Sequence, residues 1–172
     1  MTDQYVVQML QQIYTRSIMG EFLVIALARV WIFLFVPLLF WLWIYGNTKE
    51  KHSVKEALWS AGMSILLGEI IGQFIMRERP FLAISDVISL IPAPLTSSFP
   101  SIHTATAVAI TAALYFANPF FGAIGIIVTI GIIFGRMSAG VHYPTDIFGG
   151  IILGLLCFAI IRLGHKALRA KK

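Results

Sequence analysis

Residues 120–163 read FFGAIGIIVTIGIIFGRMSAGVHYPTDIFGGIILGLLCFAIIRL. Two apolar runs flank a short polar segment, and each run is close to the roughly 20 residues that a helix needs to cross a bilayer. The pattern predicts two membrane-spanning helices, at 120–137 and 145–163, joined by the loop 138–144. The polar residues of this loop are therefore expected at one surface of the membrane.

The rest of the chain extends this pattern. Of its 172 residues, 58% are hydrophobic and 12% are charged, whereas a soluble domain carries roughly 25% charged residues. Three further spans are predicted at 18–45, 54–76 and 101–116. This composition excludes a soluble enzyme and a disordered chain, and we predict an all-α integral membrane protein with five transmembrane helices in one bundle.

The two ends of the chain differ from the spans. Residues 1–17 lack the basic start of a secretory signal, and their apolar residues recur at helical spacing between glutamines. They predict an amphipathic helix that lies in the membrane interface. Residues 18–163 then form the bundle and residues 164–172 a basic tail, all within the single domain 1–172.

Lysine and arginine counts predict the orientation, because basic residues concentrate on the cytoplasmic side. One predicted face carries eight of them, against four on the other. We therefore expect the C-terminus in the cytoplasm and the N-terminus outside. Topology and anionic headgroups explain the net charge of +5 without a nucleic-acid partner. His52 and His165 lie on the basic face, and nothing in their sequence context assigns them chemistry.

The less basic face gathers polar side chains from four helix ends. Polar residues at this depth are costly unless partnered, so their gathering predicts a functional site. The planar guanidinium of arginine can donate two hydrogen bonds to phosphate oxygens, and a helix N-terminus favours the binding of an anion. No Walker loop or nucleotide fingerprint is present, which argues against a nucleoside triphosphate. The residues of this set are Arg77, Arg79, Ser101, His103, Arg136, His142 and Asp146.

Two histidines from separate loops predict two chemical roles. A neutral imidazole can attack phosphorus, and a second can protonate the departing oxygen. Asp146 follows His142 by four residues and can orient its ring, which makes His142 the better nucleophile and His103 the general acid. Each histidine alone would more often be an ordinary interfacial polar residue, so the combination carries the prediction.

Three segments resemble the signature motifs of the type 2 phosphatidic acid phosphatase (PAP2) superfamily. They are Arg79-Pro80, the run Pro100 to His103, and Arg136 followed by His142 and Asp146. The resemblance is greatest to the bacterial undecaprenyl-diphosphate phosphatases. It implies hydrolysis without a metal or other cofactor, with His142 as nucleophile, Asp146 as its partner and His103 as the acid. It also implies that Arg79, Ser101 and Arg136 cradle the phosphate.

The chain departs from the family pattern at three positions. Gly72 stands where the first motif usually has lysine, and Arg77 or Gln73 is expected to substitute for it. Ile102 replaces the usual glycine or aspartate of the second motif, and Gly135 replaces a frequent serine before Arg136. None of these changes removes a nucleophile, an acid or a carboxylate.

We therefore expect a lipid phosphatase of the bacterial plasma membrane whose site faces the periplasm or exterior. Its expected substrate is undecaprenyl diphosphate; phosphatidylglycerophosphate, phosphatidic acid and lipid A 1-phosphate are the alternatives. A non-catalytic protein that binds lipid phosphates is the alternative from another class. The apolar connection 81–99 either guides a lipid tail or is a plain interfacial loop.

Two smaller expectations concern the spans. The pairs Gly131/Gly135 and Gly150/Gly154 are spaced for close helix packing. Glu21, Arg29 and Glu69 lie within predicted spans, where a pairing among them would satisfy their charges.

Overall fold

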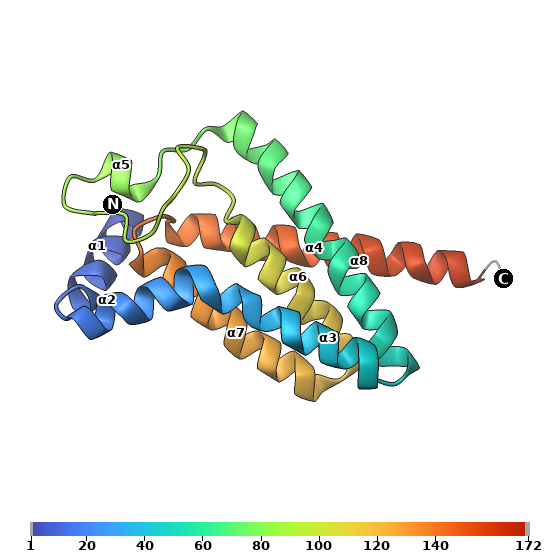
Figure 1. The fold of residues 1–172 in the computed structure, drawn as a ribbon. Helices are drawn as coiled ribbons and strands as arrows, with labels where there is room; N and C mark the ends of the chain where they lie inside the picture. Colours follow the sequence, from blue (N-terminus) through green and yellow to red (C-terminus); the bar gives the residue numbers. More distant parts are fainter. Residues whose placement is uncertain (1, 171–172) are drawn as a thin grey trace.

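The computed structural model describes residues 2–170 and shows a helical bundle, with no strand in that part of the chain (Figure 1). Long helices run side by side, and short ones cover one end of the bundle. The α-helices are α1 (Thr2–Tyr14), α2 (Ile18–Ile25), α3 (Phe35–Tyr45), α4 (Thr48–Ile75), α5 (Pro80–Ala83), α6 (Ile102–Ala117), α7 (Pro119–Ser138) and α8 (Pro144–Ala170).

The first predicted span is one helical rod with an irregular centre. A π-helical turn (Ala26–Val30) and a 3₁₀ turn (Trp31–Leu34) connect α2 to α3. Pro37 follows in the first turn of α3. Its ring removes one backbone donor and crowds the carbonyl one turn earlier, so an ordinary α-helical hydrogen-bond ladder cannot pass through this segment.

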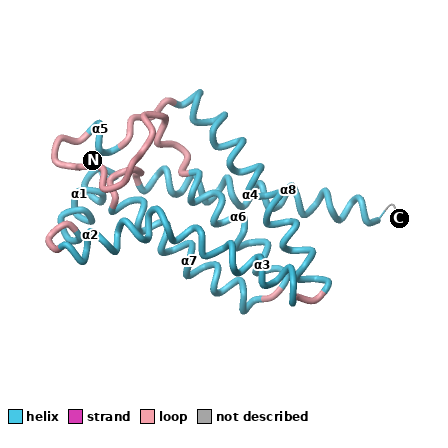
Figure 2. The backbone as a smooth tube through the Cα atoms, in the orientation of Figure 1, coloured by secondary structure: helices cyan, strands magenta, loops and turns pink. Residues whose placement is uncertain are grey.

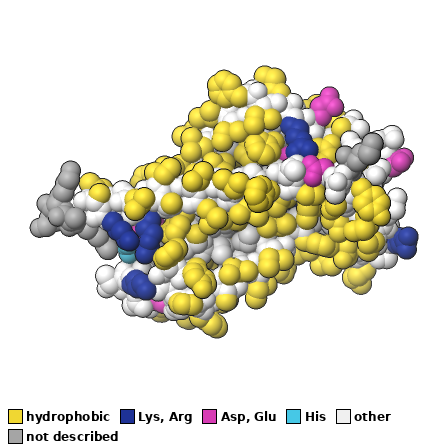
Figure 3. All heavy atoms as spheres, turned by 180° about the vertical axis from the view of Figure 1, so that it is seen from behind, with side chains coloured by type: hydrophobic (Ala, Val, Ile, Leu, Met, Phe, Trp, Pro, Cys, Tyr) yellow, Lys and Arg dark blue, Asp and Glu magenta, His cyan; other side chains and the backbone are white. Residues whose placement is uncertain are grey.

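Four helical stretches are long and apolar enough to cross a membrane: Ile18–Tyr45, Thr48–Ala83, Pro119–Ser138 and Pro144–Leu168. Their outward side chains form a broad hydrophobic surface, with most charged groups toward the ends of the molecule (Figure 3). The length and the composition of these helices therefore identify an integral membrane protein.

The predicted span at 101–116 is the exception, because α6 is shorter than the others. It packs against α4, α7 and α8, and most of its side chains are buried. A helix surrounded by protein does not need the length that lipid contact demands, which explains why its sequence is rich in alanine and threonine rather than leucine.

The predicted glycine packing is confirmed. A Cβ atom on Gly135 would lie 2.5 Å from the backbone nitrogen of Ala28, so α7 and the first span touch backbone to backbone there. A Cβ atom on Gly154 would in the same way collide with the carbonyl oxygen of Ala105. These contacts bring α7 against the first span and α8 against α6.

Two boundaries differ from the sequence expectation. Helix α4 begins at Thr48 rather than 54, because Asn47 and Glu50 form a reciprocal capping box at its start. Helix α8 continues to Ala170, so most of the predicted basic tail is helical.

The longest loop connects α5 to α6 and gathers at the end of the bundle where α1 also lies (Figure 2). Gln11 of α1 fastens this loop, because its amide donates to the carbonyl of Ile88 at 2.7 Å and accepts from the Ile88 N–H at 2.9 Å. Both groups of one backbone position are thus satisfied by a single side chain.

The expected pairing of Glu21, Arg29 and Glu69 does not form among the described residues. Arg29 is exposed, and Glu69 lines the cavity described below.

Candidate active site

A cavity of about 580 Å³ opens at the loop-rich end of the bundle. Its walls come from the last turns of α4, the α5–α6 connection, the start of α6, the end of α7 and the loop before α8. Both predicted histidines, His103 and His142, line it together with Arg79 and Arg136. The tertiary structure thus brings together side chains from three separate sequence motifs around one space.

The two ring nitrogens of His142 face different partners, a backbone carbonyl and an arginine. Its Nδ1 lies 2.8 Å from the carbonyl oxygen of Ser98, so Nδ1 carries the proton and donates it to that oxygen. The opposite nitrogen, Nε2, lies 3.2 Å from a terminal nitrogen of Arg136. In this tautomer Nε2 keeps the lone pair that a nucleophilic imidazole requires, and here that lone pair accepts from Arg136.

Burial keeps His142 uncharged. Its side chain is 3% exposed. Burial lowers the pKa of His142 from 6.5 to about 4; the nearby carboxylate of Asp146 opposes this shift, and the positive charges of Arg136 and Arg79 add to it. The imidazole is therefore neutral at pH 7.

Asp146 lies on the Nδ1 side of His142, away from Nε2. Its carboxylate lies 3.7 Å from His142 Nδ1, which is within ion-pair distance but too long for a hydrogen bond. The same carboxylate accepts a hydrogen bond from the backbone N–H of Tyr143 at 2.8 Å and from Arg77 at 2.7 Å. The Ser98 carbonyl, and not Asp146, is thus the direct acceptor for Nδ1–H.

Arg77 is tied to the outer side of Asp146. Its guanidinium also donates to Asp3 at 3.0 Å and to Thr145 at 2.6 Å, and it stacks 4.2 Å over the ring of Tyr143. Burial raises the pKa of Asp3, but hydrogen bonds from Thr145 and Arg77 outweigh it and leave that pKa below its usual value. These contacts hold Arg77 as a bridge between α1 and α8.

Arg136 has donors that are not used within the protein. One terminal nitrogen donates to the carbonyl of Ala28 at 3.3 Å and the other faces His142. Its Nε is buried and has no hydrogen-bond partner. A buried donor without a partner is costly, so an anion in the cavity would complete this guanidinium.

Arg79, in contrast, donates its hydrogen bonds to backbone carbonyls of two loops. It donates to the carbonyls of Thr96, Ser97 and Val141, each at 3.1 Å. The guanidinium therefore fixes the α5–α6 connection to the loop before α8, while it still lines the cavity.

Ser101 directly precedes α6 and is fully buried. Its backbone N–H donates to the Asp146 carbonyl at 3.0 Å, and its hydroxyl accepts from Thr104 at 3.0 Å. No side chain caps the first turn of α6, where Ile102 and His103 face the cavity. The positive end of the helix dipole is thus directed at the cavity.

A model of the PAP2 superfamily matches residues 53–169. The chain belongs to this superfamily. Undecaprenyl-diphosphatase BcrC of Bacillus subtilis is 32% identical over 115 residues, which are 67% of this chain and 59% of the relative. The chain thus spans less than two thirds of the length of this curated relative.

Solved PAP2 structures share the fold. Aquifex aeolicus LpxE superposes with a TM-score of 0.78 at 27% identity, covering 94% of each chain. A PAP2-type phosphatidylglycerolphosphate phosphatase from Bacillus subtilis gives a TM-score of 0.73 at 22% identity, over 96% of this chain and 85% of the other. The likeness to the second protein is one of fold alone.

Within this PAP2 domain, sequence reasoning missed the groups that act through the backbone. Backbone carbonyls of residues 96–98 orient Arg79 and His142. Every residue has such a carbonyl, so residue type does not predict which ones act in this way. Asp3 was also missed, because it is 74 residues from its partner Arg77. The polar run at 96–98, next to an expected motif, was the available signal.

Proposed function

We propose that this PAP2 protein is a membrane lipid phosphatase that converts undecaprenyl diphosphate to undecaprenyl phosphate. The observation that carries the proposal is the shared cavity, where a neutral imidazole, a second imidazole and two guanidiniums line one space. The name of the Bacillus subtilis BcrC relative supports the choice of substrate.

In the first step, Nε2 of His142 attacks the terminal phosphorus and forms an N–P bond. The phosphoanhydride bond breaks, and His103, protonated in the complex with the anionic substrate, gives its proton to the departing lipid phosphate oxygen. The phosphoryl group takes the place of His142 Nε2, which lies 3.2 Å from Arg136, as acceptor for that guanidinium. This exchange releases the lone pair of Nε2 for attack.

In the second step, neutral His103 accepts a proton from water while the oxygen attacks phosphorus and the N–P bond breaks. Inorganic phosphate leaves, and both imidazoles return to their starting state. Asp146, 3.7 Å from Nδ1, stabilises the positive ring of the intermediate.

Charge on the equatorial oxygens is stabilised by the unpartnered Nε of Arg136 and by the first turn of α6. Arg79 contributes its charge and holds the loops in place. These fixed donors supply the role that a metal plays in other phosphatases, and we propose that turnover needs no divalent ion.

The rim of the cavity suits a lipid. Leu82 and Leu95 line it and are 53% and 81% exposed. They belong to the connection between α4 and α6, which can contact acyl or prenyl chain while the phosphate enters the polar interior. Gly72, which also lines the cavity, leaves room where the family usually has lysine.

We further propose five membrane crossings, with α6 as the short central one, and α1 lying in the interface. Tyr5, Met9 and Ile13 of α1 are exposed, which supports contact with lipid. The distribution of lysine and arginine supports a cytoplasmic C-terminus and a site at the periplasmic or outer face of a bacterial plasma membrane.

Phosphate release by the purified protein tests the function. The panel contains undecaprenyl diphosphate, phosphatidylglycerophosphate, phosphatidic acid and lipid A 1-phosphate, each with and without chelator. We expect the highest kcat/KM for undecaprenyl diphosphate, unchanged by chelator. His142→Ala should abolish turnover, whereas His165→Ala, the same substitution at the other end of the bundle, should retain it.

Three outcomes would contradict parts of this proposal. Full activity in His142→Ala would remove the nucleophile assignment. Preference for another lipid would change the substrate but keep the reaction. Tight binding of lipid phosphates without any release of phosphate would favour a non-catalytic binding protein.

A further inference from the structure

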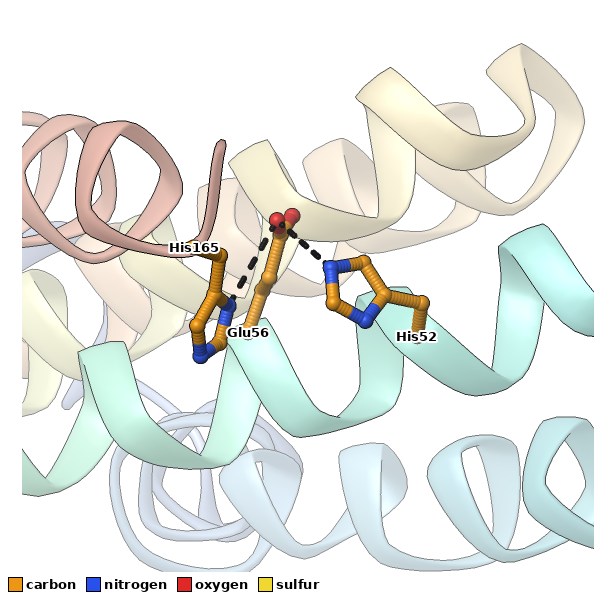
Figure 4. A group of neighbouring side chains, drawn as sticks. All are labelled: His52, Glu56 and His165. Carbon is orange, nitrogen blue, oxygen red and sulfur yellow. Dashed lines mark ion pairs between the residues drawn. The ribbon is translucent and has the colours of Figure 1, made fainter. Parts of the chain in front are cut away.

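A second cluster of ionisable side chains lies at the opposite end of the bundle from the active-site cavity. His52 and Glu56 stand one turn apart on α4, and His165 reaches them from α8 (Figure 4). Both imidazoles point a nitrogen at the same carboxylate. One ligand atom from each residue lies within 4.8 Å of the other two.

The distances approach those of a tetrahedral metal site. Nε2 of His52 lies 3.3 Å from Oε1 of Glu56, and Nδ1 of His165 lies 3.8 Å from the same oxygen. Ligand atoms bonded to one zinc ion at 2.0–2.2 Å stand about 3.3 Å apart. A small rotation of the partly exposed His165 ring would close the remaining gap.

Two further observations indicate a binding site. The Nδ1 atom of His165 is buried and has no hydrogen-bond partner, although it faces the cluster. Glu56 is 3% exposed, and its second oxygen, Oε2, accepts a hydrogen bond from Arg162 at 3.1 Å. Arg162 is itself stacked 4.5 Å over Phe116, so it fixes the carboxylate and leaves Oε1 toward the histidines.

We propose that His52, Glu56 and His165 bind a divalent transition-metal ion, with zinc as the best-matched ion. Two histidines and one glutamate are a common zinc ligand set, and the fourth position would face the adjoining pocket of about 210 Å³. Arg162 is the outer partner that orients Glu56. The ion would join α4 to α8 at the end of the bundle away from the phosphatase site.

Positive charge around the cluster lowers its affinity for a metal cation. Lys49 and Lys166 line the same pocket as Arg162 and oppose a cation. Both lysine side chains are exposed, so they can turn toward water, where salt screens them. The same charges would favour an anion, but Glu56 lies at the centre of the cluster and would repel one.

Metal titration of the full chain in detergent, purified without a histidine tag, tests the site. Co²⁺ serves as the spectroscopic probe and Zn²⁺ as the competitor. We expect one Co²⁺ per chain with the intense visible absorption of tetrahedral coordination, removed by Zn²⁺. Zn²⁺ should also raise the melting temperature, because it binds only the folded arrangement.

Matched variants separate a metal site from general charge effects. His165→Ala should weaken Zn²⁺ binding by at least about tenfold, as should His52→Ala. Lys166→Ala removes a charge from the same pocket without removing a ligand, so metal binding should stay or strengthen.

The proposal is overturned if Co²⁺ shows no tetrahedral spectrum or if both histidine variants bind Zn²⁺ as the parent does. Binding of inorganic phosphate that Lys166→Ala abolishes, without metal binding, would instead assign the pocket to an anion. Phosphate release from the lipid substrate in chelator reports on the other end of the bundle and separates this result from the proposed function.

Discussion

The burial of His142, the proposed nucleophile, predicts an unusual pH dependence. A histidine with an ordinary pKa of 6.5 is about 90% protonated at pH 5.5, whereas one with a pKa of about 4 is about 3% protonated. The difference corresponds to about 3 kcal/mol against the charged ring. Because the neutral ring is the proposed nucleophile, kcat/KM should stay near its plateau at pH 5.5 and fall only as the pH approaches 4.

The acid limb of kcat/KM for phosphate release measures this pKa, since it reports ionisations of the free enzyme and free substrate. Asp146→Asn provides the matched variant. The carboxylate favours the charged ring, so its removal should lower the pKa of His142 further and move the limb to lower pH. Protonation of the substrate is common to both proteins and cancels in the comparison.

Nitrogen NMR of the histidine side chains gives a direct check. The His142 signal, identified by its loss in His142→Asn, should show the neutral Nδ1–H tautomer at pH 5.5, because the Ser98 carbonyl accepts that proton. An acid limb near 6.5 that Asp146→Asn leaves in place would refute the argument from burial.

Two further substitutions test the phosphate cradle and the packing. Arg136→Lys keeps the charge but loses the unpartnered Nε, so kcat for phosphate release should fall by ~10²–10³; a kcat near that of the parent would exclude Arg136 from transition-state binding. Gly135→Ala places a Cβ 2.5 Å from the backbone of Ala28, so it should lower the free energy of unfolding by about 1–3 kcal/mol and reduce the melting temperature. Gly164→Ala, where nothing lies within 4 Å, should have little effect, and equal melting temperatures for the two variants would contradict the close contact.

Local patterns in the sequence were enough to predict the helical membrane fold and the gathering of the site residues at one end of the bundle. Apolar runs of spanning length, ending in charged or small polar residues, identify helices wherever they pack. The spacing of Arg136, His142 and Asp146 predicted that the three groups lie together, because His142 is in a short loop and the other two flank that loop. The close approach of Gly135 was also predictable, since only glycine permits it.

Only the tertiary structure decided which groups contact one another. The acceptor for the His142 ring proved to be a backbone carbonyl 44 residues away, at Ser98, and not the nearby Asp146. Arg77, expected at the phosphate, is held by Asp3 from the far end of the chain. Such hydrogen bonds depend on how loops fold back, and residue type alone does not encode a carbonyl's direction.

The cluster at the other end shows the same division. The one-turn spacing of His52 and Glu56 could be read from the sequence, because residues four apart share a helix face. The arrival of His165 beside them depends on how α4 and α8 cross, which close packing around α6 determines. Chain periodicity therefore fixes which face a residue occupies, and only the packing of whole helices decides what that face meets.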